Sequence, residues 1–177
     1  NHPLDYPDDD VNQLGTPLTQ EEYDRFGAWA WDYRSIEEIN RLRAERKNPG
    51  ATVYDDPNCF RGYLWTARMI QEALGFMVPI ISTEGGPVVG WGDDKRYPKV
   101  IPDQHAEWQV EICRFLQEEA PDYYFTCCTW LLASRGLGDF NPTWDQMSWY
   151  THAWDERFGL NGQLPVIQAL KDLPSVS

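Results

Sequence analysis

A single carboxylate lies where the sequence predicts both a strand end and a tight turn. Glu84 directly follows the apolar, β-branched run 76–83 and precedes Gly85-Gly86. The run is typical of a buried strand, and the two glycines let the backbone turn and a ligand come close. A carboxylate at the end of a buried strand costs free energy unless it is paired or used. Glu84 is therefore a candidate catalytic group, and the alternative is a carboxylate that caps a neighbouring structure.

Two strand–loop–helix units are predicted to position this carboxylate. The strand 76–83 is followed by the long loop 85–102, then by a helix for which Asp103 is the expected N-cap. A second apolar run, 123–130, predicts another buried strand, and this one ends at Trp130. Alternating strands and helices indicate a parallel sheet, in which functional side chains gather at the C-terminal ends of the strands. Both strand ends are thus expected at one edge of the sheet.

The part of the chain before the first strand is predicted to be largely helical. Capping boxes at 19–22 and 35–38 begin two helices that are separated by a break near Tyr33. A third helix, 60–74, carries apolar residues on one face, and Gly75 stands where a C-terminal glycine belongs.

The net charge and the tryptophan content indicate which classes of partner to expect. The net charge is −13, with 28 acidic against 15 basic residues, so the attraction to phosphate on which nucleic-acid binders rely is absent. Nucleic acid and anionic membranes are not expected partners, and no apolar run is long enough to span a membrane. The nine tryptophans fit core packing and sugar binding equally well, because the C–H face of a pyranose stacks on an indole.

The four cysteines do not predict a metal centre. No CxxC pair or Cys/His cluster with zinc spacing occurs, so we expect no metal site. Alternation along the second strand sends Cys127 and Cys128 to opposite faces, and buried free thiols are favoured over a disulfide. If Glu84 and Trp130 both face the site, alternation gives Ile80 and Ser82 the orientation of Glu84, and Thr126 and Cys128 that of Trp130, with Cys127 directed to the opposite face. The cysteines are Cys59, Cys113, Cys127 and Cys128.

Three motifs resemble the clan-A glycoside hydrolases, which are cellulase-like retaining enzymes. Residues 79–86 are similar to that family's seventh barrel strand, which ends in the nucleophilic Glu, here Glu84. Residues 125–130 resemble the eighth strand, whose final tryptophan, here Trp130, forms the floor beneath the sugar. Asn1-His2-Pro3 resembles the end of the sixth strand, which implies that His2 binds substrate. The family often has a Tyr two residues after this His, and this chain has Leu4 there instead.

The resemblance implies an α/β fold, namely the C-terminal portion of a TIM (β/α)₈ barrel. Residues 1–177 would be part of a single catalytic domain, with the tail of strand six, strands seven and eight with their helices, and a long loop and helical insertion at about 1–58. An ordinary barrel has about 250 residues. The remaining N-terminal part of the barrel is thus an expected partner. It should also supply the acid/base, because the family's strand-ending Asn-Glu pair does not occur from Asn1 onward.

The function implied by the resemblance is cleavage of a β-glycosidic bond in an oligo- or polysaccharide by a retaining mechanism, without a cofactor. Trp91, in the glycine-rich loop after Glu84, is a candidate accessory sugar platform, or alternatively packs that loop down. For Trp29 and Trp31 we favour core packing over a place in the cleft. The competing hypotheses are a non-catalytic carbohydrate-binding or scaffold protein derived from the barrel, and an unrelated small α/β domain in which Glu84 is structural.

Overall fold

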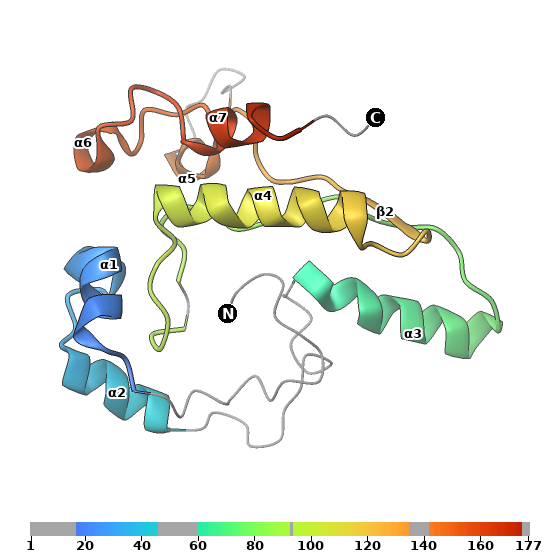
Figure 1. Ribbon diagram of the computed structural model, residues 1–177, viewed down its shortest axis with the longest axis horizontal. Helices are drawn as coiled ribbons and strands as arrows, with labels where there is room; N and C mark the ends of the chain where they lie inside the picture. Colours follow the sequence, from blue (N-terminus) through green and yellow to red (C-terminus); the bar gives the residue numbers. More distant parts are fainter. Residues whose placement is uncertain (1–16, 46–59, 93, 135–141, 175–177) are drawn as a thin grey trace.

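The computed structural model describes residues 17–45, 60–92, 94–134 and 142–174 (Figure 1). His2 and Cys59 lie outside these ranges, as do much of the expected insertion at 1–58 and the motif at the chain start. In chain order the elements are α1 (Gln20–Ala30), α2 (Ile36–Ala44), the 3-10 turn η2 (Phe60–Gly62), α3 (Tyr63–Leu74), β1 (Ile80–Ser82), α4 (Pro102–Glu118), β2 (Tyr124–Cys127), α5 (Pro142–Met147), α6 (Asp155–Phe158) and α7 (Val166–Lys171).

The two predicted strands are present as parallel neighbours, β1 and β2, with α4 as the crossover between them. Both are shorter than predicted. Pro79, directly before β1, has no N–H to donate to a ladder, which is consistent with the late start of that strand. The barrel assignment remains a prediction, because two strands do not distinguish a partial barrel from another parallel sheet.

A register shift between the strands separates two residues that alternation had placed together. Ile81 pairs with Thr126 and Ser82 pairs with Cys127, after an irregularity between Ile80 and Ile81. Paired residues of adjacent strands share a face, so Ser82 and Thr126 lie on opposite faces. The expectation that they share one face is wrong, because simple alternation does not allow for a bulge.

One face of the strand pair is covered by α3 and α4. Ile80 and Tyr124 pack there against Tyr63 and Ala67 of α3 and Phe115 of α4. The rings of Tyr63 and Tyr124 stack with centroids 4.0 Å apart and an interplanar angle of 5°. This cluster fixes the strand pair to its helices.

The other face of the strand pair is uncovered by the described residues. Ile81 is 49% exposed and Phe125, which alternates with the buried Tyr124, is 61% exposed. Apolar residues in a parallel sheet are normally covered on both faces.

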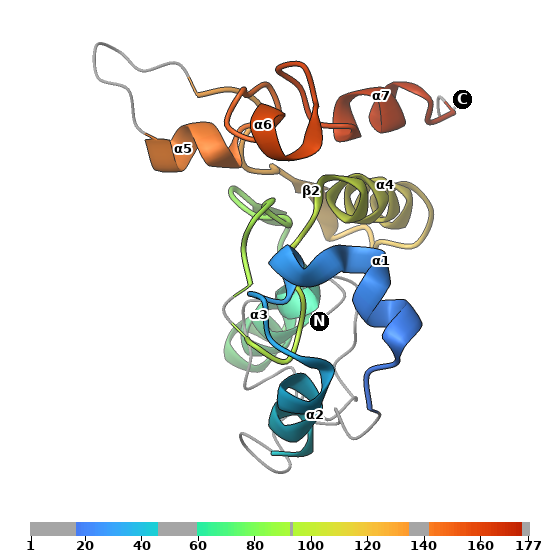
Figure 2. The same cartoon turned by 90° about the vertical axis from the view of Figure 1, so that its left-hand side faces the viewer.

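Two further clusters flank this core. After β2 the chain returns over α4, and α5, α6 and α7 lie on the side of α4 away from α1, α2 and α3 in both views (Figure 1 and Figure 2). This layer is held by buried Val89, Trp149 and Leu164, among others. The helix pair α1–α2 has its own small core of Leu18, Trp31 and Ile39.

The first two helices begin where the capping patterns predicted. Thr19 and Glu22 form a complete capping box: the Thr19 side chain accepts from the Glu22 amide, and the Glu22 carboxylate accepts from the Thr19 amide. Ser35 caps α2 by accepting from the Glu38 amide. Tyr33 has a positive φ of 60°, which confirms the predicted break between the helices.

The later helix ends give one confirmation and one correction. Gly75 ends α3 in the left-handed conformation with φ 76°, as predicted. The N-cap of α4 is Ile101 and not Asp103, because Pro102 occupies the first helical position, where its fixed φ and missing N–H suit a helix start. Asp103 lies inside the first turn, where a negative charge is favourable.

The loop after β1 is tied to the end of α1 through Lys99. The Lys99 amide donates to the Ala30 carbonyl at 2.6 Å. The ammonium group of Lys99 forms an ion pair with Asp32 and lies 5.2 Å from the centroid of the Trp29 ring. The hydrogen bond from Lys99 lowers the pKa of the Asp32 carboxyl. Among the described residues no helix is both long and apolar enough to cross a membrane.

Candidate functional site

Glu84 lies two residues beyond β1, at the C-terminal edge of the strand pair. Its side chain is exposed. Within the described part of the chain, the structure gives no hydrogen bond or ion pair to its carboxylate. The group is therefore open to a ligand and is not consumed by a structural contact with these residues.

Trp130 lies beside the Glu84 turn, because the ladder of hydrogen bonds continues past the strands. The Cys128 amide donates to the Ser82 carbonyl at 2.8 Å, and the Trp130 amide donates to the Gly85 carbonyl at 2.9 Å. The Trp130 side chain is partly exposed and meets Trp144 edge to face, with ring centroids 6.0 Å apart. The two strand-end residues singled out in the sequence thus occupy the same edge.

Two buried polar side chains of α4 lie directly behind the Glu84 turn. Gln109 is fully buried, and a Cβ built on Gly86, whose φ is +95°, would come within 2.8 Å of its Nε2. Burial lowers the pKa of His105 to about 4, although a contact with the Pro87 backbone acts to raise it, so the imidazole is neutral at pH 7. These contacts place the back of the turn against α4.

The buried polar pair was missed by the sequence interpretation. Neither polar atom of the Gln109 carboxamide nor Nδ1 of His105 has a hydrogen-bond partner among the described residues. The available signal was their spacing: positions 105 and 109 share a helical stripe with Ile112, which is fully buried. Polar residues on a buried stripe indicate a contact that needs them, and here that contact is with the turn after Glu84.

The described thiols are free, in three different environments. Cys113 and Cys127 are partly buried, and burial raises the pKa of both thiols. Cys128 is exposed, because Cys127 occupies the covered side next to Tyr124. The expectation of buried thiols is therefore wrong for Cys128.

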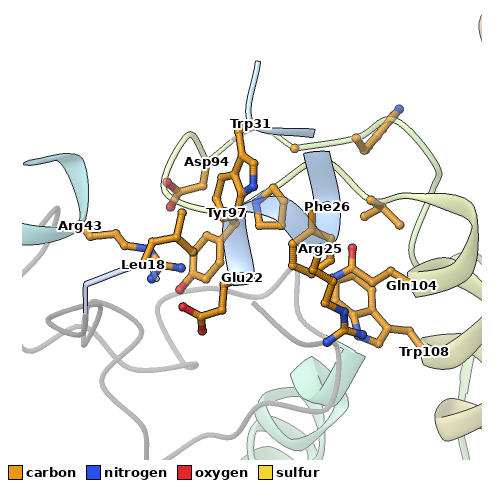
Figure 3. Close-up of a pocket in the computed structure, with 14 residues that line it drawn as sticks. Leu18, Glu22, Arg25, Phe26, Trp31, Arg43, Asp94, Tyr97, Gln104 and Trp108 are labelled. Atoms are coloured by element: carbon orange, nitrogen blue, oxygen red, sulfur yellow. The ribbon is translucent and has the colours of Figure 1, made fainter. Parts of the chain in front are cut away.

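Trp91 lines a cavity of about 420 Å³ between α1, the loop after β1 and the start of α4 (Figure 3). Its side chain is 54% exposed. Trp31 also borders the cavity but is buried and stacked on Tyr23, as core packing predicts. Trp29 packs edge to face against Trp154 and is likewise a packing residue. The other lining residues are Leu18, Glu22, Arg25, Phe26, Arg43, Gly92, Asp94, Tyr97, Pro98, Val100, Gln104 and Trp108.

The sequence-predicted residues therefore fall into separate places. Glu84 and Trp130 share the strand edge, whereas Trp91 borders a cavity whose lining includes neither of them. No group of three or more potential metal ligands occurs in the parts of the chain that the structure describes.

Comparison with known proteins adds no relative: no protein-family model matches the chain, and neither a curated protein nor a solved structure matches it significantly.

Proposed function

We propose that this chain supplies the nucleophile of a retaining β-glycoside hydrolase, with Glu84 as the attacking carboxylate and Trp130 beneath the sugar. The observation that carries the proposal is the shared strand edge: an exposed carboxylate without a fixed partner among the described residues lies beside a partly exposed indole. A charged group open to the ligand and an apolar platform next to it are what glycoside cleavage requires. The motifs around both residues support the same function.

The reaction would follow a double displacement. The Glu84 carboxylate attacks the anomeric carbon while the bond from that carbon to the leaving oxygen breaks, and the leaving oxygen takes a proton from the acid/base. The same acid/base then removes a proton from water, which attacks the anomeric carbon and releases Glu84. Both steps need a second carboxyl group about 5–5.5 Å from the first. By the resemblance it is carried on the family's fourth barrel strand.

The positioning of Glu84 is assigned to α4 in this proposal. Gln109 and His105 meet Gly86 and Pro87 from behind, so the turn that carries the carboxylate rests on a rigid element. Sites supported in this way keep their geometry better than sites on unsupported loops.

The test is Glu84→Gln in the full-length natural protein. This change keeps the shape of the side chain and removes its negative charge, so turnover of an aryl β-glycoside should fall by about 10⁴-fold or more, with sugar binding retained. Glu118→Gln is the matched control, since Glu118 is an exposed carboxylate on α4 away from the strand edge. Turnover near the parent rate in Glu84→Gln would reject Glu84 as the nucleophile.

Azide rescue tests the covalent step separately. Glu84→Ala leaves room for a small anion, so added azide should restore cleavage of an activated glycoside and give a glycosyl azide of inverted anomeric configuration. Absence of that product, with the variant folded, would contradict a nucleophilic role for Glu84.

A second candidate is a carbohydrate-binding protein that uses the same edge without catalysis. It is favoured by one observation: no described residue donates a hydrogen bond to Glu84, although a nucleophile is usually kept ionised by such donors. Saccharide binding that requires Trp130, without turnover in the parent protein, would support this candidate.

A further inference from the structure

The cavity beside Trp91 is lined by several elements of the fold, and its lining does not include Glu84 or Trp130. Figure 3 shows Gln104 and Trp108 of α4 on one side, Phe26 and Trp31 from the α1 region at the centre, and Arg43 of α2 on the far side. Its volume of about 420 Å³ is within the usual range for sites that take small organic ligands.

Aromatic rings form much of the wall. Phe26, Trp31, Trp91, Tyr97 and Trp108 all line the cavity. Trp91 is the most exposed of them, at 54%, and so has surface that a ligand in the cavity can contact. Such walls favour a ligand with an apolar face.

The charged groups of the lining are balanced and already engaged. Glu22 accepts from the Thr19 amide at 2.8 Å, and Asp94 holds Arg96 through hydrogen bonds as short as 2.5 Å. Arg25 pairs with Glu107 at 3.2 Å, and Arg43 Nε donates to the Arg96 carbonyl at 3.2 Å. Among the described lining residues, two carboxylates and two guanidinium groups give no net charge, so the cavity favours a neutral ligand over a phosphate or a uronate.

A buried side-chain oxygen of Gln104 indicates that the ligand carries hydroxyl groups. The Gln104 side chain is 9% exposed, and its Oε1 has no hydrogen-bond partner among the described residues. A buried carbonyl oxygen that stays unpaired costs about 1–3 kcal/mol. A purely apolar ligand would leave Oε1 unsatisfied, whereas a hydroxylated one would donate to it.

We infer that this cavity is a binding site for a neutral saccharide, which stacks a pyranose face on Trp91 and donates a hydroxyl hydrogen bond to Oε1 of Gln104. A pyranose combines an apolar C–H face with hydroxyl donors, which is the combination that the walls and Gln104 require. The inference goes beyond the proposed hydrolysis, because it uses neither Glu84 nor Trp130.

Calorimetric titration of the full-length protein tests the site. The Glu84→Gln background prevents turnover, and the probes are cellotriose, mannotriose and xylotriose, with trigalacturonate and inorganic phosphate as charged probes. Trp91→Ala should weaken binding of the neutral trisaccharide about three- to tenfold, through loss of stacking. Gln104→Met, which keeps the side-chain length but removes the acceptor, should weaken it about tenfold.

Matched controls separate this site from the strand edge. Trp65→Ala and Gln117→Met change an exposed indole and an exposed carboxamide on α3 and α4 that do not line the cavity, so affinity should stay within about twofold. Trp130→Ala should leave the cavity's binding event in place. If Trp130→Ala removes all binding while Trp91→Ala and Gln104→Met change nothing, the saccharide binds at the strand edge and the inference is wrong.

Two other outcomes also overturn the inference. One is the absence of binding by all three neutral probes at about 10 mM, which corresponds to affinities too weak for a specific site. The other is tighter binding of trigalacturonate or phosphate than of any neutral trisaccharide. Loss of hydrolysis in Glu84→Gln bears only on the proposed catalysis, so the two proposals fail independently.

Discussion

On one face of the β1–β2 pair, Ile80 and Tyr124 are buried beneath α3 and α4, whereas Ile81 and Phe125 on the other face are largely exposed. The two faces have similar apolar composition but different surroundings. Strands with apolar residues on both faces are typical of sheets covered on both sides. The strand pair therefore has the composition of an interior sheet, although the described residues cover only one of its two faces. We expect further polypeptide, on our proposal the rest of the barrel, to cover the exposed face.

The largest effect is expected on the covered face, from Tyr124→Ala. This change removes a stacked ring and a hydroxyl that is 2.9 Å from Ser82 Oγ, so the free energy of unfolding should fall by about 3–5 kcal/mol. Urea unfolding measures the change, and Tyr150→Ala, at a half-exposed tyrosine, should cost less than about 1 kcal/mol. Equal small losses at both positions would remove the contrast between the two faces.

His105 is buried on α4, the helix that covers the strand pair, and it should make the free energy of unfolding depend on pH. Burial depresses its pKa from 6.5 to about 4, so the unfolded chain binds this proton more readily than the folded one. Stability from this group is present above pH 6.5 and is lost as pH falls toward 4, by about 3 kcal/mol at 1.36 kcal/mol per pKa unit. Unfolding free energies of the parent and His105→Gln between pH 7 and pH 4 should converge by about this amount. Parallel pH profiles would show that His105 is not buried in solution.

A smaller effect is expected from Gly86→Ala, where the turn after Glu84 meets α4. The φ of +95° and the 2.8 Å approach to Gln109 Nε2 both oppose a Cβ, so the cost should lie at the upper end of about 1–3 kcal/mol. Gly75→Ala is the matched control, because its φ is +76° with nothing within 4 Å, and it should cost about 1 kcal/mol. In a Gln109→Ala background the penalty at Gly86 should shrink. An unchanged penalty there would argue against contact between the turn and Gln109.

The smallest effect is expected on the exposed face of the 177-residue chain. Ile81→Ala and Phe125→Ala should each change its unfolding free energy by no more than about 0.5 kcal/mol, because both side chains are already largely in water. In a complete protein whose further strands cover this face, the same changes should cost about 2–5 kcal/mol. Small effects in both preparations would mean that the face is exposed in the mature molecule too.

Local signals in the sequence predicted which helices and strands form better than they predicted the residues at which these elements begin and end. The capping box at Thr19 and the glycine at Gly75 each act within a few residues, and both are found as predicted. The apolar run 76–83 predicted a strand, but its length depends on which backbone groups meet a partner, and the ladder begins at Ile80. At the start of α4, Pro102 outweighed the side-chain signal of Asp103.

The strand-end residues of the candidate site could be predicted from the sequence, but the side chains of α4 that lie behind them could not. Glu84 and Trp130 could be placed at one edge because parallel strands end together. The buried Gln109 and the cavity lining at Gln104 arise from contacts between segments far apart in the chain, which no local pattern encodes. The roles of Glu84, Trp130, Trp91 and His2 remain predictions for the experiments above to test.

The attachment of Lys99 to α1 has a consequence for how this surface can vary. Its amide, its ammonium group and its contact with Trp29 join the loop after β1 to the end of the first helix at three points. A loop grafted from another protein without its matching helix would leave Ala30 and Asp32 without these contacts. The loop after β1 and the end of α1 therefore have to be exchanged together. A recombinant chain that takes them from two different proteins should fold poorly.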